Sequence, residues 1–468
     1  MTSPAVPNPI APPADSVMSQ PGFTWGVATA SFQIEGSTQA DGRLPSIWDT
    51  FCATPGKVLG GDTGEPGCDH YRRADADLDL IADLGVDAYR LSIAWPRVMH
   101  ADGTPNEAGI AFYVRLLDGM AARGVKAMVT LYHWDLPQHL EDAGGWLNRD
   151  TAYRFADYAD LMSRRLAGKV HAWATLNEPW CSAFLGYGNG HHAPGLSDPK
   201  LATQAMHHLL LGHGLALAHL EANDPGAQRG IVANIGRGGT PGEGPGGGTS
   251  GSAEDLDAVR LFEMQHNDWV LQPLLQGSYP QELFDRLWPG SAPVMHDGDL
   301  AVISRPIDFL GINYYFRSTV KADGRGGFDM VERPGIERTQ MGWEVHPQGL
   351  DELLVGFKAR YANLPPIHIT ENGMASDDQV VIEADGPRVH DVQRTAYLRR
   401  HFEAIDRAIR AGVDVRGYYV WSLMDNFEWA FGYERRFGLV HVDYTTQVRT
   451  LKDSARHFRD FLHRRREG

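Results

Sequence analysis

Short runs of apolar and β-branched residues recur along the chain, and each is followed by a longer amphipathic or loop-rich segment. Strands buried on both faces of a parallel sheet have continuous apolar character, and amphipathic segments between them are typical of helices that cover the sheet. The sequence predicts eight such strands, over residues 23–30, 88–93, 126–132, 172–177, 230–235, 309–315, 367–371 and 417–422.

Helical patterns occupy several of the segments between these strands. Over residues 75–84, apolar residues repeat at helical spacing until Gly85, and glycine commonly ends a helix. A second helix is predicted over residues 395–411. Eight strands alternating with helices favour a closed barrel over an open doubly wound sheet, and no Gly-x-Gly-x-x-Gly pattern follows an early strand. We therefore expect an α/β fold, a single (β/α)8 TIM barrel with long βα loops.

Two segments depart from this pattern. Residues 1–20 are rich in Pro, Ala and Ser and have neither a basic leader nor a continuous apolar stretch, so we expect a disordered tail and no signal peptide. Residues 21–468 are expected to form the one barrel domain. Residues 236–252, GRGGTPGEGPGGGTSGS, consist mostly of Gly, Ser, Thr and Pro, which predicts a mobile loop after the fifth strand.

Composition narrows the range of partners. The 468 residues include 43 Lys and Arg against 59 Asp and Glu, a formal charge of -16 that argues against nucleic acid or an anionic membrane as a partner. No run approaches the roughly 20 apolar residues that span a bilayer. Three cysteines, Cys52, Cys68 and Cys181, form no Cys-x-x-Cys pair or Cys/His cluster. We expect a cytoplasmic protein without a metal or cofactor.

Polar and aromatic residues cluster where the predicted strands end. The active sites of such barrels lie at the C-terminal ends of the strands. The second strand contains Arg90. The residues at the strand ends or in the segments that follow them are Gln33, His133, Asn177, Glu178, Asn313, Tyr315, Glu371, Trp421, Glu428 and Trp429. Glu178 and Glu371 should face each other across the barrel mouth, among amides and rings. Cleavage of an acetal needs one acid and a second carboxylate, so the pattern indicates a sugar site.

Five segments of the chain form a recognisable set of motifs. They are FTWGVATASFQIEG at 23–36, YRLSIAWPR at 89–97, TLNEP at 175–179, ITENG at 369–373 and WSLMDNFEW at 421–429. Taken together in this order, they resemble glycoside hydrolase family 1. The resemblance covers nearly the whole chain after residue 20. It implies a retaining β-glycosidase, most simply a β-glucosidase acting on a small β-glycoside or short oligosaccharide.

The resemblance also implies a division of labour between the two carboxyl groups. Glu178 would be the acid/base, and Glu371 would attack the anomeric carbon to form a covalent glycosyl-enzyme. Arg90 and a hydrogen bond from Tyr315 would stabilise the carboxylate form of Glu371, whereas burial and the charge of Glu371 would keep Glu178 protonated. For a retaining enzyme the two carboxyl groups should lie about 5 to 5.5 Å apart.

The family's substrate pocket carries over to positions around these two residues. The resemblance assigns substrate binding to Gln33, His133, Asn177, Asn313, Tyr315, Trp343, Trp421, Glu428 and Trp429. Gln33 and Glu428 would bind the distal hydroxyls, and Asn177 the hydroxyl beside the reacting carbon. Trp421 would be the platform for the sugar ring, and Trp343 would lie on the aglycone side.

Two other functions remain open at this level. A 6-phospho-β-glycosidase uses a neutral donor where this chain has Glu428, and an anionic Glu428 would repel phosphate, which favours a neutral sugar. A non-catalytic carbohydrate-binding protein would be expected to have lost one carboxylate, and both are present. Sugar preference among glucose, galactose and fucose, the share of transglycosylation and the oligomeric state are not determined by these residues.

Overall fold

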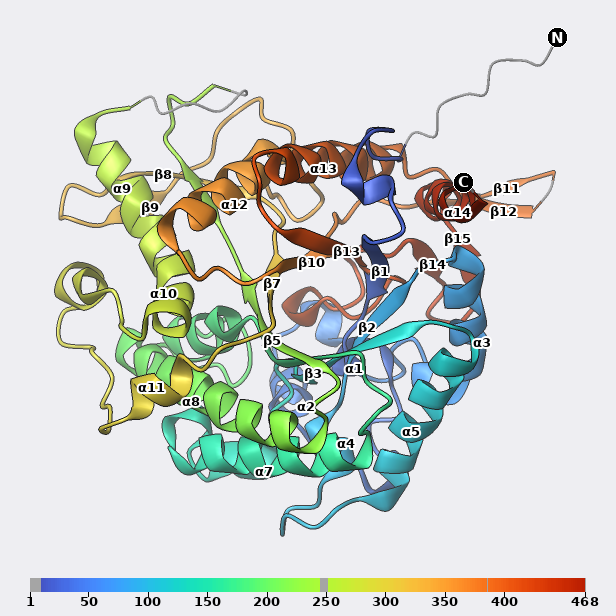
Figure 1. Cartoon of the computed structure of the whole chain (residues 1–468), viewed down its shortest axis with the longest axis horizontal. Coiled ribbons are helices and arrows are strands. Elements are labelled where there is room, and N and C mark those ends of the chain that lie inside the picture. Colours follow the sequence, from blue (N-terminus) through green and yellow to red (C-terminus); the bar gives the residue numbers. More distant parts are fainter. Residues whose placement is uncertain (1–9, 245–250, 385, 468) are drawn as a thin grey trace.

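The computed structural model describes residues 10–244, 251–384 and 386–467. Its centre is a closed barrel of eight parallel strands in the order β1-β13-β10-β7-β5-β4-β3-β2 (Figure 1). The barrel strands are β1 (Thr24–Ala28), β2 (Ala88–Ser92), β3 (Lys126–Tyr132), β4 (Ala172–Asn177), β5 (Gln228–Asn234), β7 (Phe309–Asn313), β10 (Ile367–Asn372) and β13 (Val415–Trp421). Each coincides with a predicted strand to within about two residues at either end, so the predicted fold class is confirmed.

The barrel closes where β1 pairs with β13, with Gly26 opposite Tyr419. A Cβ atom on Gly26 would come within 2.3 Å of the Tyr419 ring, so glycine permits this close approach of ring and backbone. All eight strands run parallel, which places their C-terminal ends at one mouth of the barrel.

Helices surround the barrel, as Figure 1 shows. The longer ones are α3 (His70–Leu84), α5 (Glu107–Ala122), α7 (Asp150–Arg165), α8 (Pro199–Asn223), α9 (Ala253–Glu263), α10 (Trp269–Gln276), α12 (Gln348–Arg360), α13 (Val392–Arg410) and α14 (Asp453–Glu467). The two predicted helices correspond to α3 and α13. α3 ends as predicted, with Gly85 in the left-handed conformation at a φ of 76°.

Shorter elements lie in the connections around the barrel, most of them in the βα loops and α11 between α10 and β7. They are the helices α1 (Ser31–Ile34), α2 (Ile47–Ala53), α4 (Trp95–Val98), α6 (Gln138–Asp142) and α11 (Asp299–Ile303), the π-helix η5 (Cys181–Gly188), and the strands β6 (Arg237–Gly239), β8 (Arg317–Ala322), β9 (Phe328–Met330), β11 (Val380–Glu383), β12 (Gly386–Val389), β14 (Val440–Val442) and β15 (Arg449–Leu451). The predicted long loops therefore carry secondary structure of their own.

The N-terminal segment differs from the predicted disordered tail. Residues 1–9 lie outside the described part of the chain, but Ile10 and Met18 are fully buried. The indole N–H of Trp25 donates to the carbonyl oxygen of Met18 at 2.9 Å. The short helix η1 (Val17–Ser19) contacts α13, beside which the blue segment lies in Figure 1. A few buried side chains, together with polar contacts such as that between Asp15 and Arg410, dock a segment whose composition is typical of disorder.

The glycine-rich segment also differs in part from the predicted mobile loop. Residues 245–250 of the segment lie outside the described residues. The first part of the segment contains the strand β6, which directly follows β5 in the chain and pairs with β8. The amide of Gly236 donates to Asn267 Oδ1 at 2.8 Å, and Glu243 is buried beside Arg317. A Cβ atom on Gly236 would lie 2.9 Å from the His266 ring, so here glycine allows close packing.

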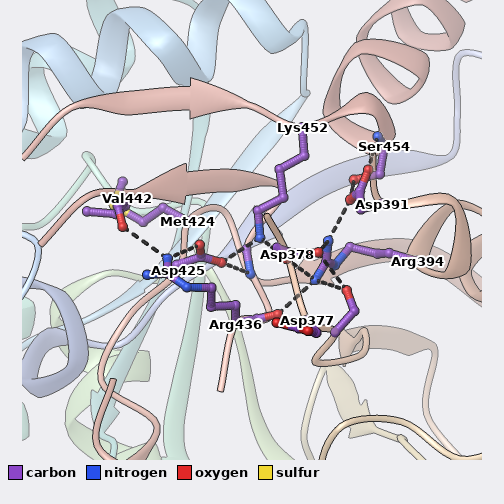
Figure 2. Close-up of polar contacts among 12 residues, drawn as sticks. Asp377, Asp378, Asp391, Arg394, Met424, Asp425, Arg436, Val442, Lys452 and Ser454 are labelled. Carbon is purple, nitrogen blue, oxygen red and sulfur yellow. Dashed lines mark hydrogen bonds and ion pairs between the residues drawn. The ribbon is translucent and has the colours of Figure 1, made fainter. Parts of the chain in front are cut away.

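A cluster of buried charged side chains joins the loop after β13 to the start of α14 (Figure 2). The fully buried Lys452 ammonium donates to Asp425 at 2.6 Å and to Asp378 at 2.5 Å. Arg394 binds Asp378 at 2.7 Å. Arg436 binds Asp425 at the same distance. Burial alone would raise the pKa of Asp378, but Arg394 and Lys452 lower it to about 2. The cations and carboxylates of the cluster thus offset the cost of burying one another's charges away from water.

Replacing Lys452 with Met should destabilise the protein strongly. Met fills a similar volume but leaves Asp378 and Asp425 without their shared cation, which for a buried pair costs about 3–5 kcal/mol of the free energy of unfolding. Urea unfolding followed by circular dichroism measures the difference. The matched control is Lys169→Met, because Lys169 pairs with Asp118 at the surface and such pairs contribute about 1 kcal/mol or less. Equal losses in the two variants would contradict the stabilising role of the buried cluster.

Candidate active site

The two carboxyl groups predicted to carry the chemistry open onto one cavity of about 650 Å³. Glu371 lies in β10, and Glu178 directly follows β4. Both are nearly buried, with 5% of Glu178 and 3% of Glu371 exposed. The cavity has the volume of a small-molecule site, and it lies at the mouth where the barrel strands end.

Most of the sequence-predicted site residues line this same cavity. Those on its wall are His133, Glu178, Asn313, Tyr315, Trp343, Glu371, Trp421, Glu428 and Trp429. The other three, Gln33, Asn177 and Arg90, are fully or almost fully buried behind that wall and hydrogen-bonded to residues of the site or its supporting loop.

Three residues of the wall have an unusual backbone conformation. Trp134, Glu178 and Trp429 have φ angles of 75°, 46° and 52°. Residues with a Cβ atom rarely adopt this left-handed region, and such conformations gather at functional sites where the surrounding structure holds them. For Glu178 the conformation turns the chain sharply at the end of β4.

Glu371 receives one donor on each carboxyl oxygen. Arg90 Nη1 donates to Oε1 at 2.5 Å, and the Tyr315 hydroxyl donates to Oε2 at 2.5 Å. Burial, followed by the charge of Glu371, raises the pKa of Tyr315 well above its ordinary range, so the phenol stays a neutral donor. A guanidinium and a phenol at these distances stabilise negative charge on Glu371 and fix its orientation.

A chain of hydrogen bonds connects Glu371 to Glu178. The second guanidinium nitrogen of Arg90 donates to Asn177 Oδ1 at 2.7 Å. Asn313 Nδ2 lies 3.2 Å from the same oxygen and donates to Glu178 Oε1 at 2.7 Å. Residues from β2, β4, β7 and β10 thus hold both carboxyl groups in one network.

Glu178 has the properties of a group that carries a proton at neutral pH. Burial, followed by the negative charge of Glu371, raises the pKa of Glu178 to about 8, although hydrogen bonds from Asn313 and Cys181 oppose the change. Of these two carboxyl groups, Glu371 is paired with the Arg90 guanidinium, whereas the surroundings of Glu178 favour its protonated form.

The charge of Glu428 differs from the one expected from the sequence, where Glu428 was taken to be an anion. Burial and the nearby Glu371 and Glu178 raise the pKa of Glu428 to about 8, which favours its protonated form at neutral pH. An anionic Glu428 that repels phosphate is therefore not the reason to prefer a neutral sugar. The sequence did not reveal this because the other two carboxyl groups approach Glu428 only in the folded protein.

Comparison with known proteins identifies the family. A model of glycosyl hydrolase family 1 matches residues 18–467. The chain belongs to this family. The family resemblance and the class of enzyme predicted from the sequence, a glycoside hydrolase, are thereby confirmed.

Similar members of the family come from several bacteria. The chain is 46% identical over 463 residues to a bifunctional β-D-glucosidase/β-D-fucosidase of Bifidobacterium breve, which covers 94% of this chain and 97% of that protein. It is 45% identical over 438 residues to β-glucosidase A of Thermotoga maritima, covering 92% of this chain and 95% of that protein. A solved structure of the Thermotoga maritima β-glucosidase in complex with glucoimidazole matches with a TM-score of 0.89 at 43% identity, covering 95% of this chain and 98% of that chain.

Buried polar atoms in this family 1 site are left available for a ligand. Gln33 Nε2 donates to Asn426 Oδ1 at 3.1 Å and to the Phe427 carbonyl at 2.8 Å. Its Oε1 has no hydrogen-bond partner within the described residues, and neither has His133 Nδ1. His133 Nε2 faces the Asn177 amide at 3.1 Å. Burial holds the pKa of His133 well below its usual range, so the ring is neutral. Buried polar atoms of this kind usually have a partner, and a sugar hydroxyl would supply one.

Several residues of the cavity wall were not predicted from the sequence. They are Trp134, Trp180, Cys181, His192, Met341 and Phe437 among others. The Trp134 ring lies 4.5 Å from Trp429 and 5.2 Å from His192, between centroids. Trp134 could have been included because it directly follows His133 at a strand end. His192 lies in a long loop, and nothing in its local sequence indicates the aromatic cluster that it joins.

Two negative findings apply to the described residues. Among them, no group of three or more His, Cys, Asp or Glu side chains could hold a metal ion. Nor does any helix within residues 10–244, 251–384 and 386–467 combine the length and apolar character required to cross a membrane.

Hydrolytic activity should be lost as the pH rises through about 8. The pKa of Glu178 is raised to about 8, so the protonated acid is present below that pH and is lost above it. The measurement is kcat/KM for a nitrophenyl glucoside from about pH 5 to 10. Because Glu428 has a similar pKa, Glu428→Gln is the control, and its alkaline limb should persist at a similar pH. Disappearance of the limb in that variant would show that Glu428 and not Glu178 is responsible.

Proposed function

We propose that this protein is a retaining exo-β-glycosidase, specifically a β-glucosidase, that releases terminal non-reducing β-D-glucosyl residues through a covalent glycosyl-enzyme. The observation that supports this most is the contrast between the two carboxyl groups in one cavity. Glu371 is held by Arg90 and Tyr315, whereas the pKa of Glu178 is raised to about 8. A nucleophile and a proton donor are the two groups that the retaining reaction requires.

In the first step, the Glu371 carboxylate attacks the anomeric carbon while Glu178 donates its proton to the leaving oxygen. The bond from the anomeric carbon to the aglycone breaks as the bond to Glu371 forms, and the aglycone departs as an alcohol. The Arg90 guanidinium and the Tyr315 hydroxyl keep the attacking carboxylate in place before the reaction. The separation of about 5 to 5.5 Å between the two carboxyl groups stays a prediction.

In the second step, formation of the ester removes the negative charge of Glu371. Since that charge is one cause of the raised pKa of Glu178, its loss favours the ionised form of Glu178. The Glu178 carboxylate then takes a proton from water, and the resulting hydroxide attacks the anomeric carbon and releases Glu371. The same pair of residues thus serves as acid and then as base. Interception of the intermediate by an alcohol would instead give transglycosylation.

The remaining site residues are proposed to bind the sugar. Gln33 and Glu428 would bind the distal hydroxyls, which is consistent with the unpartnered Oε1 of Gln33. Asn177 would contact the hydroxyl next to the reacting carbon, where contacts strengthen in the transition state. Trp421 would support the ring, and Trp343 would lie on the aglycone side.

The choice of sugar rests on the relatives. Similar proteins are named β-glucosidases, and one is named a bifunctional β-D-glucosidase/β-D-fucosidase. Fucose is therefore the second sugar to test. We propose a small β-glycoside or short oligosaccharide as the substrate and the cytoplasm as the location. The three cysteines are buried and free, which is compatible with a reducing compartment.

Removal of either carboxyl group should give a distinct kinetic signature. Glu371→Gly is expected to abolish turnover of nitrophenyl glucoside, because no nucleophile remains. Azide or formate should restore part of this turnover by attacking the anomeric carbon from the space that the Glu371 side chain occupied. Glu178→Ala should lower kcat/KM for substrates with poor leaving groups by about 10²–10⁴-fold. A protein that binds glucose yet releases no aglycone at any pH would instead be a carbohydrate-binding protein.

A neutral glucoside should be preferred over its 6-phosphate. A phosphate would add negative charge to a cavity whose ionised Glu371 is already paired with Arg90. The ratio of kcat/KM for nitrophenyl glucoside and nitrophenyl glucoside 6-phosphate measures this preference, with the fucoside assayed in parallel. A higher value for the phosphorylated substrate would replace the proposal with a 6-phospho-β-glycosidase.

A further inference from the structure

Cys181 contacts the carboxyl group that supplies the proton. Its Sγ lies 3.1 Å from Glu178 Oε2, within hydrogen-bond distance for sulfur, and it lines the same cavity with 7% of the residue exposed. Glu178 Oε1 is occupied separately by Asn313 at 2.7 Å. Each oxygen of Glu178 therefore accepts one donor from the protein, and lone pairs remain for the leaving oxygen or the attacking water.

The backbone brings Cys181 to this position. Glu178 has a left-handed φ of 46°, and its carbonyl oxygen accepts hydrogen bonds from the amides of Cys181 and Ser182 at 2.9 and 3.3 Å. The turn leads directly into η5, whose first residue is Cys181. The contact between thiol and carboxyl is thus local in sequence and fixed by the turn.

The thiol is a donor under all conditions in which the enzyme is expected to work. Burial, followed by the charge of Glu178, raises the pKa of Cys181 well above its ordinary range. A thiol hydrogen bond is strengthened when its acceptor becomes a carboxylate, so it favours the ionised form of Glu178.

Other charged and titratable groups also face Glu178. Their combined effect disfavours the ionised form of Glu178, and the hydrogen bond from the thiol opposes that effect. Glu371 and Glu428 disfavour ionisation of Glu178, whereas Arg90 favours it. Tyr315 from the end of β7 and His133 from the end of β3 are neutral.

We propose that Cys181 is a positioning residue that anchors Glu178 Oε2 and favours its ionised form when Glu178 acts as a base. This inference rests on the proposed function, since it concerns the second step of the same reaction. Cys181 acts through Glu178, while Asn313 holds the other oxygen in both steps.

The experiment compares Cys181→Val and Cys181→Ala, which lack a donor, with Cys181→Ser, which keeps one. In the variants without a donor, the alkaline limb of kcat/KM for nitrophenyl glucoside should move upward by about half a pH unit, because the ionised form of Glu178 loses a hydrogen bond. The Ser variant should return the limb to the wild-type position or below. Cys52→Ser is the matched control, because Cys52 lies in α2 and is not part of the cavity wall.

A second readout separates positioning from general damage. With a dinitrophenyl glucoside, whose leaving group departs without a proton, kcat/KM reports formation of the glycosyl-enzyme and kcat reports its hydrolysis. Loss of the thiol should lower kcat by about threefold, within the range expected for a weak hydrogen bond, and leave kcat/KM unchanged. A structural role alone would lower both values, and Ser would not restore them.

The outcomes distinguish the two proposals. Suppose that the wild-type enzyme is active, that Glu178→Ala removes this activity, and that the alkaline limb stays in place in both Cys181→Val and Cys181→Ala. This result would overturn only the role of Cys181. Absence of hydrolysis by the wild-type enzyme would overturn the proposed function and this inference with it. Circular dichroism of each variant establishes that the folded proteins are being compared.

Discussion

The ion pair between Arg90 and Glu371 is the interaction on which the site depends. Three carboxyl groups, those of Glu178, Glu371 and Glu428, line one cavity, and like charges at close range disfavour each other's ionisation. Arg90 donates directly to Glu371 and so favours negative charge there. The pKa values of the other two are raised to about 8. The position of one guanidinium thus favours negative charge on Glu371, whereas the surroundings of Glu178 and Glu428 favour their protonated forms.

The barrel supplies this arrangement because its parallel strands all end at one mouth. Arg90 comes from β2, Asn313 from β7 and Glu371 from β10, and a hydrogen-bond network connects them across the barrel. The loop after β13 adds a separate constraint. Lys452 fixes Asp425 in that loop, and the neighbouring Asn426 accepts a hydrogen bond from Gln33. A buried cluster outside the cavity therefore stabilises the loop that carries Glu428.

The regular parts of the fold were predictable, and the irregular parts were not. The barrel strands are almost wholly buried and rich in apolar and β-branched residues, so their positions could be identified from local composition. The docked segment around Ile10 and Met18 has few apolar anchors, and they follow no helical or strand period. The strand β6 lies in a glycine-rich stretch and is specified by its partner β8. The π-helix that begins at Cys181 follows from the sharp turn at Glu178. Such features depend on contacts or backbone angles that a residue pattern does not encode.

The sequence by itself determined the barrel and the family, and it predicted Glu178 and Glu371 as the reacting pair, since these follow from local patterns and from motifs at the strand ends. Tertiary structure decided their protonation. The pKa of Glu428 depends on burial and on two carboxyl groups that are distant in the sequence, and the same holds for the effect of Glu371 on Glu178. The physical reason is that desolvation and Coulomb interaction depend on distances in space, which exist only once the strands have closed into a barrel.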